Sequence, residues 1–334
     1  MTTVVYVSNA ESGTVSVMHL DLSTGTLTTV QTVELGGMLM PVAISPDRRV
    51  LHVARRSEPL AVRSLRISAQ DGTLSSLGEV PLPASMANIA TDVTGRFLFS
   101  ASYGGNLVAV SPIGTDGAVQ RPQQVLPTEP KAHAMRVDPS NRFVFVPLLG
   151  ADKVLQFRFD AASGRLTPND PPALVARPGS GPRHLAFHPN GHTLYLLHEL
   201  DASIDVLEMD SERGTLKAVQ TVSALPAGFS GNPWASDIHL TPDARHLYAS
   251  ERRSHTLAAF AVAADGTLAP QGSFATQAQP RGFAIDPSGR FLIAAGQASH
   301  RLGIHAIDPS SGSLRLQGEH TAGQDPNWVE VICL

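Results

Sequence analysis

Short apolar runs alternate with tight polar turns along the whole chain. The run Phe291-Leu292-Ile293, for example, closely follows the turn Asp286-Pro287-Ser288. The chain holds 28 Gly and 25 Pro, residues that interrupt helices and mark turns. This pattern predicts many short strands rather than long helices.

A turn that carries Gly and, two residues later, Leu or Val recurs at a nearly constant interval. Its copies are centred on Gly25, Gly72, Gly117, Gly164, Gly214, Gly266 and Gly312, at spacings of 47, 45, 47, 50, 52 and 46 residues. A second turn, which has Pro at its centre in five of six copies, lies between these copies. It is centred on Pro46, Val93, Pro139, Pro189, Pro242 and Pro287. A fixed period of this length is typical of a repeat architecture.

Each repeat accommodates four short strands joined by these turns, which is the blade of a β-propeller. Residues 1–334 are therefore predicted to form a single all-β domain, a seven-bladed β-propeller with four antiparallel strands per blade. The first strand, at residues 4–7, has no inner strand before it, and residues 327–332 form an inner strand with no repeat after it. We expect these two half repeats to join and close the ring. A solenoid or two smaller β domains would leave both half repeats unexplained.

The charge pattern favours a small-molecule partner. The net charge is −4 and the 25 basic residues are scattered, so neither nucleic acid nor a membrane surface is expected as a partner. Cys333 is the only cysteine, which excludes an intrachain disulfide. Residues 1–7 carry no basic segment and no long apolar run, so no signal peptide is expected. These features predict a cytoplasmic protein, and we expect a monomer.

Equivalent positions of all blades converge around the axis of a propeller. Six residues before the Pro turn lie Met40, Ala87, His133, Arg183, Ser236 and Arg281, with Asn327 as the seventh by alignment. Ten residues after the same turn lie Arg56, Tyr103, Leu149, Glu199, Arg252 and Gln297, with Ala10 as the seventh. The start of one strand and the end of its antiparallel partner share an edge, so both sets are expected at one mouth of the channel.

The arginines of this mouth predict an anion-binding site, because the guanidinium fork matches carboxylate and phosphate. The expected catalytic residues are Glu199, His133, Arg183 and Arg252. The expected substrate-binding residues are Arg281, His184, Arg56, Asn327 and Gln297.

The sequence leaves three alternatives open. Glu199 either accepts a proton from water or pairs with Arg183 to position it. His133 is either the base or a structural histidine ahead of a strand. Either Arg252 or Arg253 faces the channel.

Several enzyme classes lack their motifs in this sequence. It contains no Gly-x-Ser-x-Gly elbow, no His-Glu-x-x-His, no Walker motif and no Gly-x-Gly-x-x-Gly. The 13 histidines are dispersed without ligand spacing, and the cations of the mouth would repel a metal ion. Neither a metal nor another cofactor is expected.

Four segments carry a family resemblance: Gly181-Pro182-Arg183-His184, His198-Glu199-Leu200-Asp201, Glu251-Arg252 and Gln279-Pro280-Arg281-Gly282. With them, the whole chain resembles the bacterial propeller-type 6-phosphogluconolactonases. The resemblance implies hydrolysis of 6-phosphogluconolactone to 6-phosphogluconate, in the oxidative pentose phosphate pathway, without a cofactor.

A related cycloisomerase branch uses a His, two Arg and a Glu, which map onto His133, Arg183, Arg252 and Glu199. The segment Glu251-Arg252-Arg253-Ser254 departs from the Asn-Arg-Gly-His of that branch. The alternatives are a hydrolase or cycloisomerase acting on another lactone or a muconate-type acid, and a non-enzymatic propeller scaffold.

Overall fold

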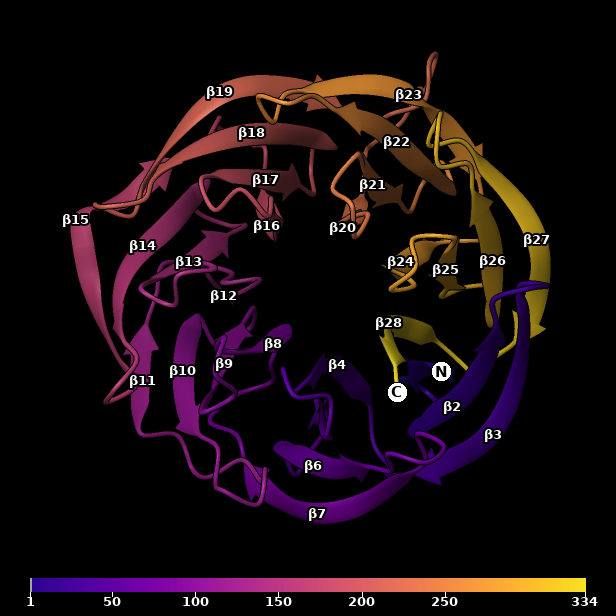
Figure 1. Cartoon of the computed structure of the whole chain (residues 1–334). Helices are drawn as coiled ribbons and strands as arrows, with labels where there is room; N and C mark the ends of the chain where they lie inside the picture. Colours follow the sequence, from indigo (N-terminus) through magenta and orange to yellow (C-terminus); the bar gives the residue numbers. More distant parts are fainter. Residues whose placement is uncertain (1) are drawn as a thin grey trace.

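Seven four-stranded antiparallel sheets stand around a central axis in the computed structural model, which describes residues 2–334 (Figure 1). Within these residues there are 28 strands, and the predicted seven-bladed propeller is confirmed. We number the blades from the N-terminus, with the inner strand of each blade named first.

The first four blades have these strands. Blade 1 contains β28 (Pro326–Cys333), β1 (Thr3–Asn9), β2 (Thr14–Asp21) and β3 (Thr26–Glu34). Blade 2 contains β4 (Leu39–Ile44), β5 (Val50–Arg55), β6 (Ala61–Ile67) and β7 (Leu74–Pro81). Blade 3 contains β8 (Asn88–Thr91), β9 (Phe97–Ser102), β10 (Leu107–Pro112) and β11 (Gln124–Pro127). Blade 4 contains β12 (Arg136–Val137), β13 (Phe143–Leu148), β14 (Lys153–Asp160) and β15 (Arg165–Val175).

The last three blades repeat the arrangement. Blade 5 contains β16 (Pro182–Phe187), β17 (Thr193–His198), β18 (Ser203–Asp210) and β19 (Thr215–Ser223). Blade 6 contains β20 (Ala235–Leu240), β21 (His246–Glu251), β22 (Thr256–Val262) and β23 (Leu268–Ala275). Blade 7 contains β24 (Pro280–Ile285), β25 (Phe291–Gly296), β26 (Arg301–Ile307) and β27 (Leu314–Thr321).

The ring closes as predicted, because the C-terminal strand β28 pairs with the N-terminal strand β1. Their register places Val5 opposite Val331 and Val7 opposite Val329. Figure 1 shows the two ends of the chain side by side. Closure pairs the inner edge of β1, which would otherwise be left free.

Aspartates hold the turn between the first two strands of several blades. The Asp138 carboxylate accepts hydrogen bonds from the backbone N–H groups of Ser140, Arg142 and Phe143, at 2.9, 2.8 and 2.7 Å. Asp286 does the same in blade 7. This explains the recurring Asp-Pro-Ser signal, because one carboxylate satisfies the N–H groups that a tight turn leaves unpaired.

The glycine-centred turn contacts the neighbouring blade. Gly214 has a φ of 65°, and a Cβ at this position would overlap the Phe143 ring of the preceding blade. Blades 5 and 6 are joined by the Tyr195 hydroxyl, which donates to the Gly266 carbonyl at 2.9 Å. Apolar side chains fill the space between sheets, as in the cluster of Tyr6, Val17 and Leu51 between blades 1 and 2. The glycine-centred turn therefore recurs because each blade makes the same kind of contact with its neighbour.

β-bulges at the start of the inner strands determine what faces the axis. In β16 the register with β17 shifts between Pro182 and His184, so Arg183 has no partner in the ladder. Equivalent shifts occur in β4, β20 and β24, the last between Pro280 and Phe283 around Arg281. A bulge re-aims side chains, and here it turns arginines toward one mouth of the channel.

None of the described residues 2–334 belongs to a helix long and apolar enough to cross a membrane.

Candidate active site

A buried carboxylate holds two arginines at the mouth of the channel. Glu199 directly follows β17, and its Oε2 accepts hydrogen bonds from Arg183 Nε at 2.7 Å and from Arg252 Nη2 at 2.9 Å. Burial favours the neutral carboxyl, but the guanidinium groups of Arg183 and Arg252 outweigh it and hold the pKa of Glu199 below its ordinary value. Glu199 is therefore ionised at neutral pH. None of residues 2–334 donates a hydrogen bond to its second oxygen, Oε1.

His133 lies against this ion-pair cluster from the neighbouring blade. Its Nε2 is 4.0 Å from Glu199 Oε2, and its ring packs edge-on against Tyr103 at 5.8 Å between centroids. Burial, reinforced by the Arg183 guanidinium, lowers the pKa of His133 well below its ordinary value. The ring is neutral at neutral pH and can accept a proton.

Two further arginines have no carboxylate partner among residues 2–334. Arg56 follows β5, and within that range its guanidinium donates only to Ser85 Oγ at 3.1 Å and Met40 Sδ at 3.8 Å. The guanidinium of Arg281 makes no hydrogen bond or ion pair to any residue of the described range. Burial, together with the cations of Arg183 and Arg56, lowers the pKa of Arg281 to about 10. These two positive charges are available to an anionic ligand.

A cavity of about 330 Å³ opens between these side chains. Its lining within residues 2–334 is Arg56, Ala87, Tyr103, His133, Glu199, Trp234, Arg252 and Arg281. Glu199 is the one carboxylate in this lining, which also holds three guanidinium groups. A fourth guanidinium group, that of Arg183, lies behind Glu199. The excess of positive charge suits a dianion such as a phosphate monoester.

Trp234 is the aromatic wall of the cavity. The Arg252 Cζ lies 3.8 Å from the centre of its ring, and Arg252 Nε donates to the Trp234 carbonyl at 3.0 Å. The Arg253 Cζ also lies near this ring, 4.8 Å from its centre, but Arg253 is exposed. These contacts fix Arg252, not Arg253, as the inward-facing arginine.

Comparison with known proteins agrees with the fold. The family model described as lactonase, 7-bladed beta-propeller, matches residues 2–331. The chain belongs to the seven-bladed β-propeller lactonase family. It is 44% identical over 333 residues to a Yersinia enterocolitica protein named 6-phosphogluconolactonase, with 99% of both chains covered. A Yersinia pestis protein of the same name is 44% identical over 328 residues, with 98% of this chain and 97% of the relative covered.

A solved structure of the periplasmic gluconolactonase from Pseudomonas aeruginosa superposes with a TM-score of 0.93. It is 28% identical in sequence and covers 100% of this chain and 99% of its own. The lactonase family thus includes relatives named for phosphorylated and for unphosphorylated sugar lactones.

The structure brings most of the predicted site residues of this lactonase together. Arg56, His133, Glu199, Arg252 and Arg281 line the cavity. Arg183, predicted as catalytic, lies directly behind Glu199 with a side chain that is only 2% exposed. It also donates to the Ser236 carbonyl. Its position is that of a residue that orients Glu199.

Three predicted substrate-binding residues lie outside this cavity. The Asn327 side chain is fully buried, accepts from Ser8 Oγ at 3.0 Å and donates to the Asp325 carbonyl at 3.0 Å. Gln297 Nε2 donates to Asp325 Oδ1 at 2.5 Å, which holds it at the edge of blade 7. His184 follows the bulge at Arg183 and therefore points further down the axis, where it lines a second cavity. Counting residues from the turns, without the bulge, cannot show that Arg183 lies at the mouth while His184 lines the second cavity.

Trp234 was missed because it precedes the inner strand β20 and its equivalents in other blades, Met38, Gly181 and Gln279, are not aromatic. One signal was available: it is one of only two tryptophans, and it stands directly before the strand that leads to the Arg252 position. Within residues 2–334, no three His, Cys, Asp or Glu side chains group closely enough to hold a metal ion.

Proposed function

We propose that this protein hydrolyses 6-phosphogluconolactone to 6-phosphogluconate in the oxidative pentose phosphate pathway. One observation carries the proposal: two guanidinium groups without a carboxylate partner, Arg56 and Arg281, line the same cavity as an ionised carboxylate and a neutral histidine. Relatives that are 44% identical over nearly the whole chain bear the name of this activity.

The reaction requires a base, an oxyanion-stabilising group and a phosphate-binding group. A water oxygen attacks the lactone carbonyl, the bond to the ring oxygen breaks, and that oxygen takes one proton of the water. Arg252 faces the cavity and stabilises the negative charge that develops on the carbonyl oxygen. Arg281 and Arg56 bind the phosphate dianion.

Two groups can accept the first proton from the attacking water. The Glu199 carboxylate is ionised, and its Oε2 binds two arginines. Its Oε1 makes no hydrogen bond within residues 2–334. His133 is neutral and lines the same cavity, 4.0 Å from Glu199. We assign the base to this pair and separate its members by mutation in the Discussion.

The test is a hydrolysis assay that compares 6-phosphogluconolactone with unphosphorylated gluconolactone, each with and without a chelator. We expect a much higher kcat/KM on the phosphorylated lactone and no effect of the chelator. Equal rates on both lactones would contradict the phosphate role of Arg56 and Arg281. No hydrolysis of either would contradict the proposed function.

Gluconolactone is the substrate of the second candidate activity. The observation in its favour is the match, at a TM-score of 0.93, to a protein named periplasmic gluconolactonase. A higher kcat/KM on gluconolactone in the same assay would select this activity. A cytoplasmic location and a monomeric state remain predictions, and light scattering after size-exclusion chromatography tests the second.

A further inference from the structure

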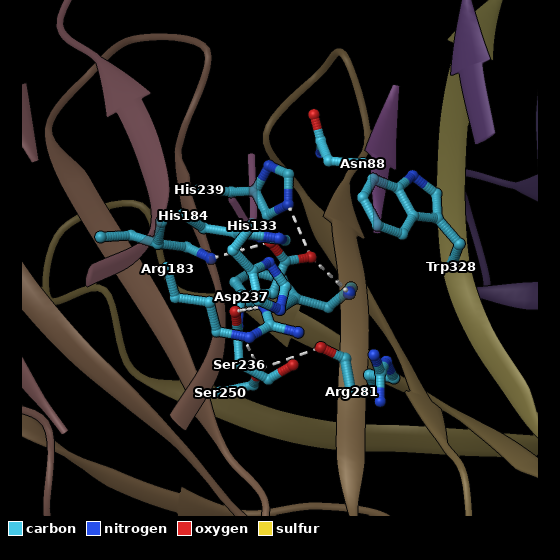
Figure 2. Close-up of polar contacts among 12 residues, drawn as sticks. Asn88, His133, Arg183, His184, Ser236, Asp237, His239, Ser250, Arg281 and Trp328 are labelled. Atoms are coloured by element: carbon cyan, nitrogen blue, oxygen red, sulfur yellow. Dashed lines mark hydrogen bonds and ion pairs between the residues drawn. The ribbon is translucent and has the colours of Figure 1, made fainter. Parts of the chain in front are cut away.

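Two buried carboxylates lie in blade 6, and they have different partners. Asp237 in β20 accepts hydrogen bonds from His184 Nδ1 at 2.8 Å and from His239 Nε2 at 3.1 Å (Figure 2). Glu251, the last residue of β21, is 0% exposed and forms no ion pair within residues 2–334. Burying a carboxylate without a cation is costly, so the hydrogen bonds of Glu251 must offset that cost.

Both oxygens of Glu251 bind segments beside the active-site cavity. Oε1 accepts from the backbone N–H of Trp234 at 2.6 Å. Oε2 accepts from the backbone N–H and the hydroxyl of Ser254, at 2.5 and 2.6 Å. Arg252, which lines the cavity, lies between Glu251 and Ser254 in the chain. The carboxylate therefore joins the turn that carries Arg252 to the residue that forms the aromatic wall.

Trp234 is held through its backbone on both sides. Its N–H donates to Glu251, and its carbonyl accepts from Arg252 N at 3.1 Å and from Arg252 Nε at 3.0 Å. The Trp234 ring forms no hydrogen bond of its own within residues 2–334, and its centre lies 3.8 Å from Arg252 Cζ. Arg252 Nη2 donates to the Ala235 carbonyl at 3.0 Å and to Glu199 Oε2 at 2.9 Å. The direction of the Arg252 guanidinium thus depends on where the Trp234 backbone lies.

The fold of the blade does not require a carboxylate at this position. Glu251 lies opposite Ala235 in the first pair of the ladder between β20 and β21. In the first pair of blade 7 the corresponding residue is Gly296, which has no side chain, and in blade 5 it is His198. Both blades form the same four strands. A carboxylate here therefore serves the blade that supplies Arg252 rather than the blade architecture.

We propose that Glu251 is a positioning residue of the active site. It fixes the Trp234 backbone and, through it, the Arg252 guanidinium that stabilises the negative charge on the lactone carbonyl oxygen. A guanidinium that is already oriented needs no rearrangement when this charge develops, which is the condition for effective stabilisation of a transition state. Glu251 does not line the cavity, so it acts without touching the substrate. This inference rests on the proposed function.

The kinetic test uses Glu251→Gln, which keeps the size of the side chain. The amide has one acceptor oxygen in place of two, so the contact with either Trp234 or Ser254 is lost. We expect kcat on 6-phosphogluconolactone to fall roughly tenfold, less than the roughly 100- to 1,000-fold loss on removal of an oxyanion donor itself. KM should stay within about twofold of the parental value, because Arg56 and Arg281 bind the phosphate from other blades. The kcat is calculated per folded site, counted by calorimetric titration with 6-phosphogluconate.

A second background separates positioning from a general loss of stability. In Arg252→Met the guanidinium is absent, so adding Glu251→Gln should lower kcat by less than about twofold more. A further loss as large as in the parent protein would show that Glu251 acts independently of Arg252, and would overturn the proposal.

Asp286→Asn is the matched control. It also removes an acceptor oxygen from a buried carboxylate that binds backbone N–H groups, in the turn between β24 and β25 of blade 7. It should lower stability and leave kcat per folded site unchanged. An equal loss of kcat in Asp286→Asn and Glu251→Gln would overturn the positioning role.

Fluorine NMR tests the positioning independently of activity. The chain holds two tryptophans, so labelling with 5-fluorotryptophan gives two resonances, which Trp328→Phe assigns. The Trp234 resonance should shift and broaden in Glu251→Gln and stay unchanged in Asp286→Asn. An unchanged Trp234 resonance in Glu251→Gln, or a parental kcat, would overturn the proposal.

Ser254→Ala replaces Glu251→Gln if the latter does not fold. It keeps the carboxylate and removes one hydroxyl donor, so kcat should fall only roughly threefold, again with a shift of the Trp234 resonance. Parental values of both would overturn the proposal. If the parent protein hydrolyses neither lactone, the proposed function fails, while the Trp234 resonance still supports or overturns the role of Glu251 in fixing Trp234.

Discussion

Replacing Arg281 by alanine removes a positive charge that the fold itself disfavours. Its guanidinium has no hydrogen-bond or ion-pair partner in the described chain, and burial together with the positive charges of Arg183 and Arg56 lowers its pKa. The same side chain lines the proposed active site. Arg281→Ala should therefore weaken substrate binding and stabilise the protein at the same time.

The effect on binding follows from the chemistry of one lost contact. A hydrogen bond to a charged group contributes about 1.5–3 kcal/mol. Since 1.4 kcal/mol corresponds to a factor of ten, KM for 6-phosphogluconolactone should rise roughly 10- to 150-fold. KM for gluconolactone should change little, because this substrate has no phosphate for Arg281 to bind.

The effect on stability follows from the lowered pKa. The pKa of Arg281, lowered to about 10 from its higher ordinary value, means that the folded state binds the proton of Arg281 more weakly than the unfolded state does. At neutral pH this difference corresponds to about 3 kcal/mol of destabilisation, which decreases as the pH rises above about 10 and is gone once the pH exceeds the unfolded pKa. Part of this gain is offset by the lost packing of the side-chain stem. We expect the free energy of unfolding to rise by about 1–2 kcal/mol.

Steady-state kinetics on both lactones and urea unfolding in phosphate-free buffer measure the two effects. Arg253→Ala is the matched control, because Arg253 is exposed and does not line the cavity. It should leave the KM ratio of the two lactones unchanged. Equal changes in KM for both lactones in Arg281→Ala would refute the phosphate role, and a clear loss of stability would refute the electrostatic argument.

Three further predictions concern the base, metal independence and ring closure. Glu199→Gln should lower kcat roughly 100-fold or more with little change in KM if Glu199 is the base; a mild effect, together with loss of turnover in His133→Ala, would assign the base to His133. Dialysis against EDTA should leave hydrolysis unchanged, because three guanidinium groups line the cavity and would repel a metal ion; activity that calcium or zinc restores would contradict this. Deleting residues 326–334 removes β28 and opens blade 1, so soluble yield and the single cooperative unfolding transition expected of one domain should be lost; parental melting of the truncated chain would contradict the role of ring closure.

The fold could be predicted because its signals are local and repeated. In the turns that begin with Asp, such as that of Asp138, the carboxylate binds the free N–H groups. Other turns use the side-chain oxygen of Ser45, Asn190 or Thr241 for the same purpose, so a polar residue recurs there. Glycine recurs where a neighbouring blade approaches, as at Gly214 against Phe143. Ring closure was predictable from the two half repeats, which only β28 and β1 together complete.

The site was predictable only where the repeat register holds. Glu199 and Arg252 directly follow a second strand, so their place at the mouth could be counted from the turns. His184 could not be placed, because the bulge at Arg183 turns it away from that mouth. The Asp237 contacts with His184 and His239 also depend on bulges, in β16 and β20, that have no signal in the repeat pattern.

The bulge in β16 has a consequence for how charge is distributed along the axis. Consecutive residues, Arg183 and His184, serve different environments: Arg183 pairs with Glu199 at the mouth, and His184 pairs with Asp237 in the second cavity. In a regular strand, neighbouring side chains would point to opposite faces of the sheet, and only one of the two would reach the axis. The bulge thus allows one strand to place a cation beside the substrate and a histidine in the second cavity. Removal of one residue from the segment 182–184 should therefore disrupt both cavities together, whereas Arg183→Met should affect the mouth alone.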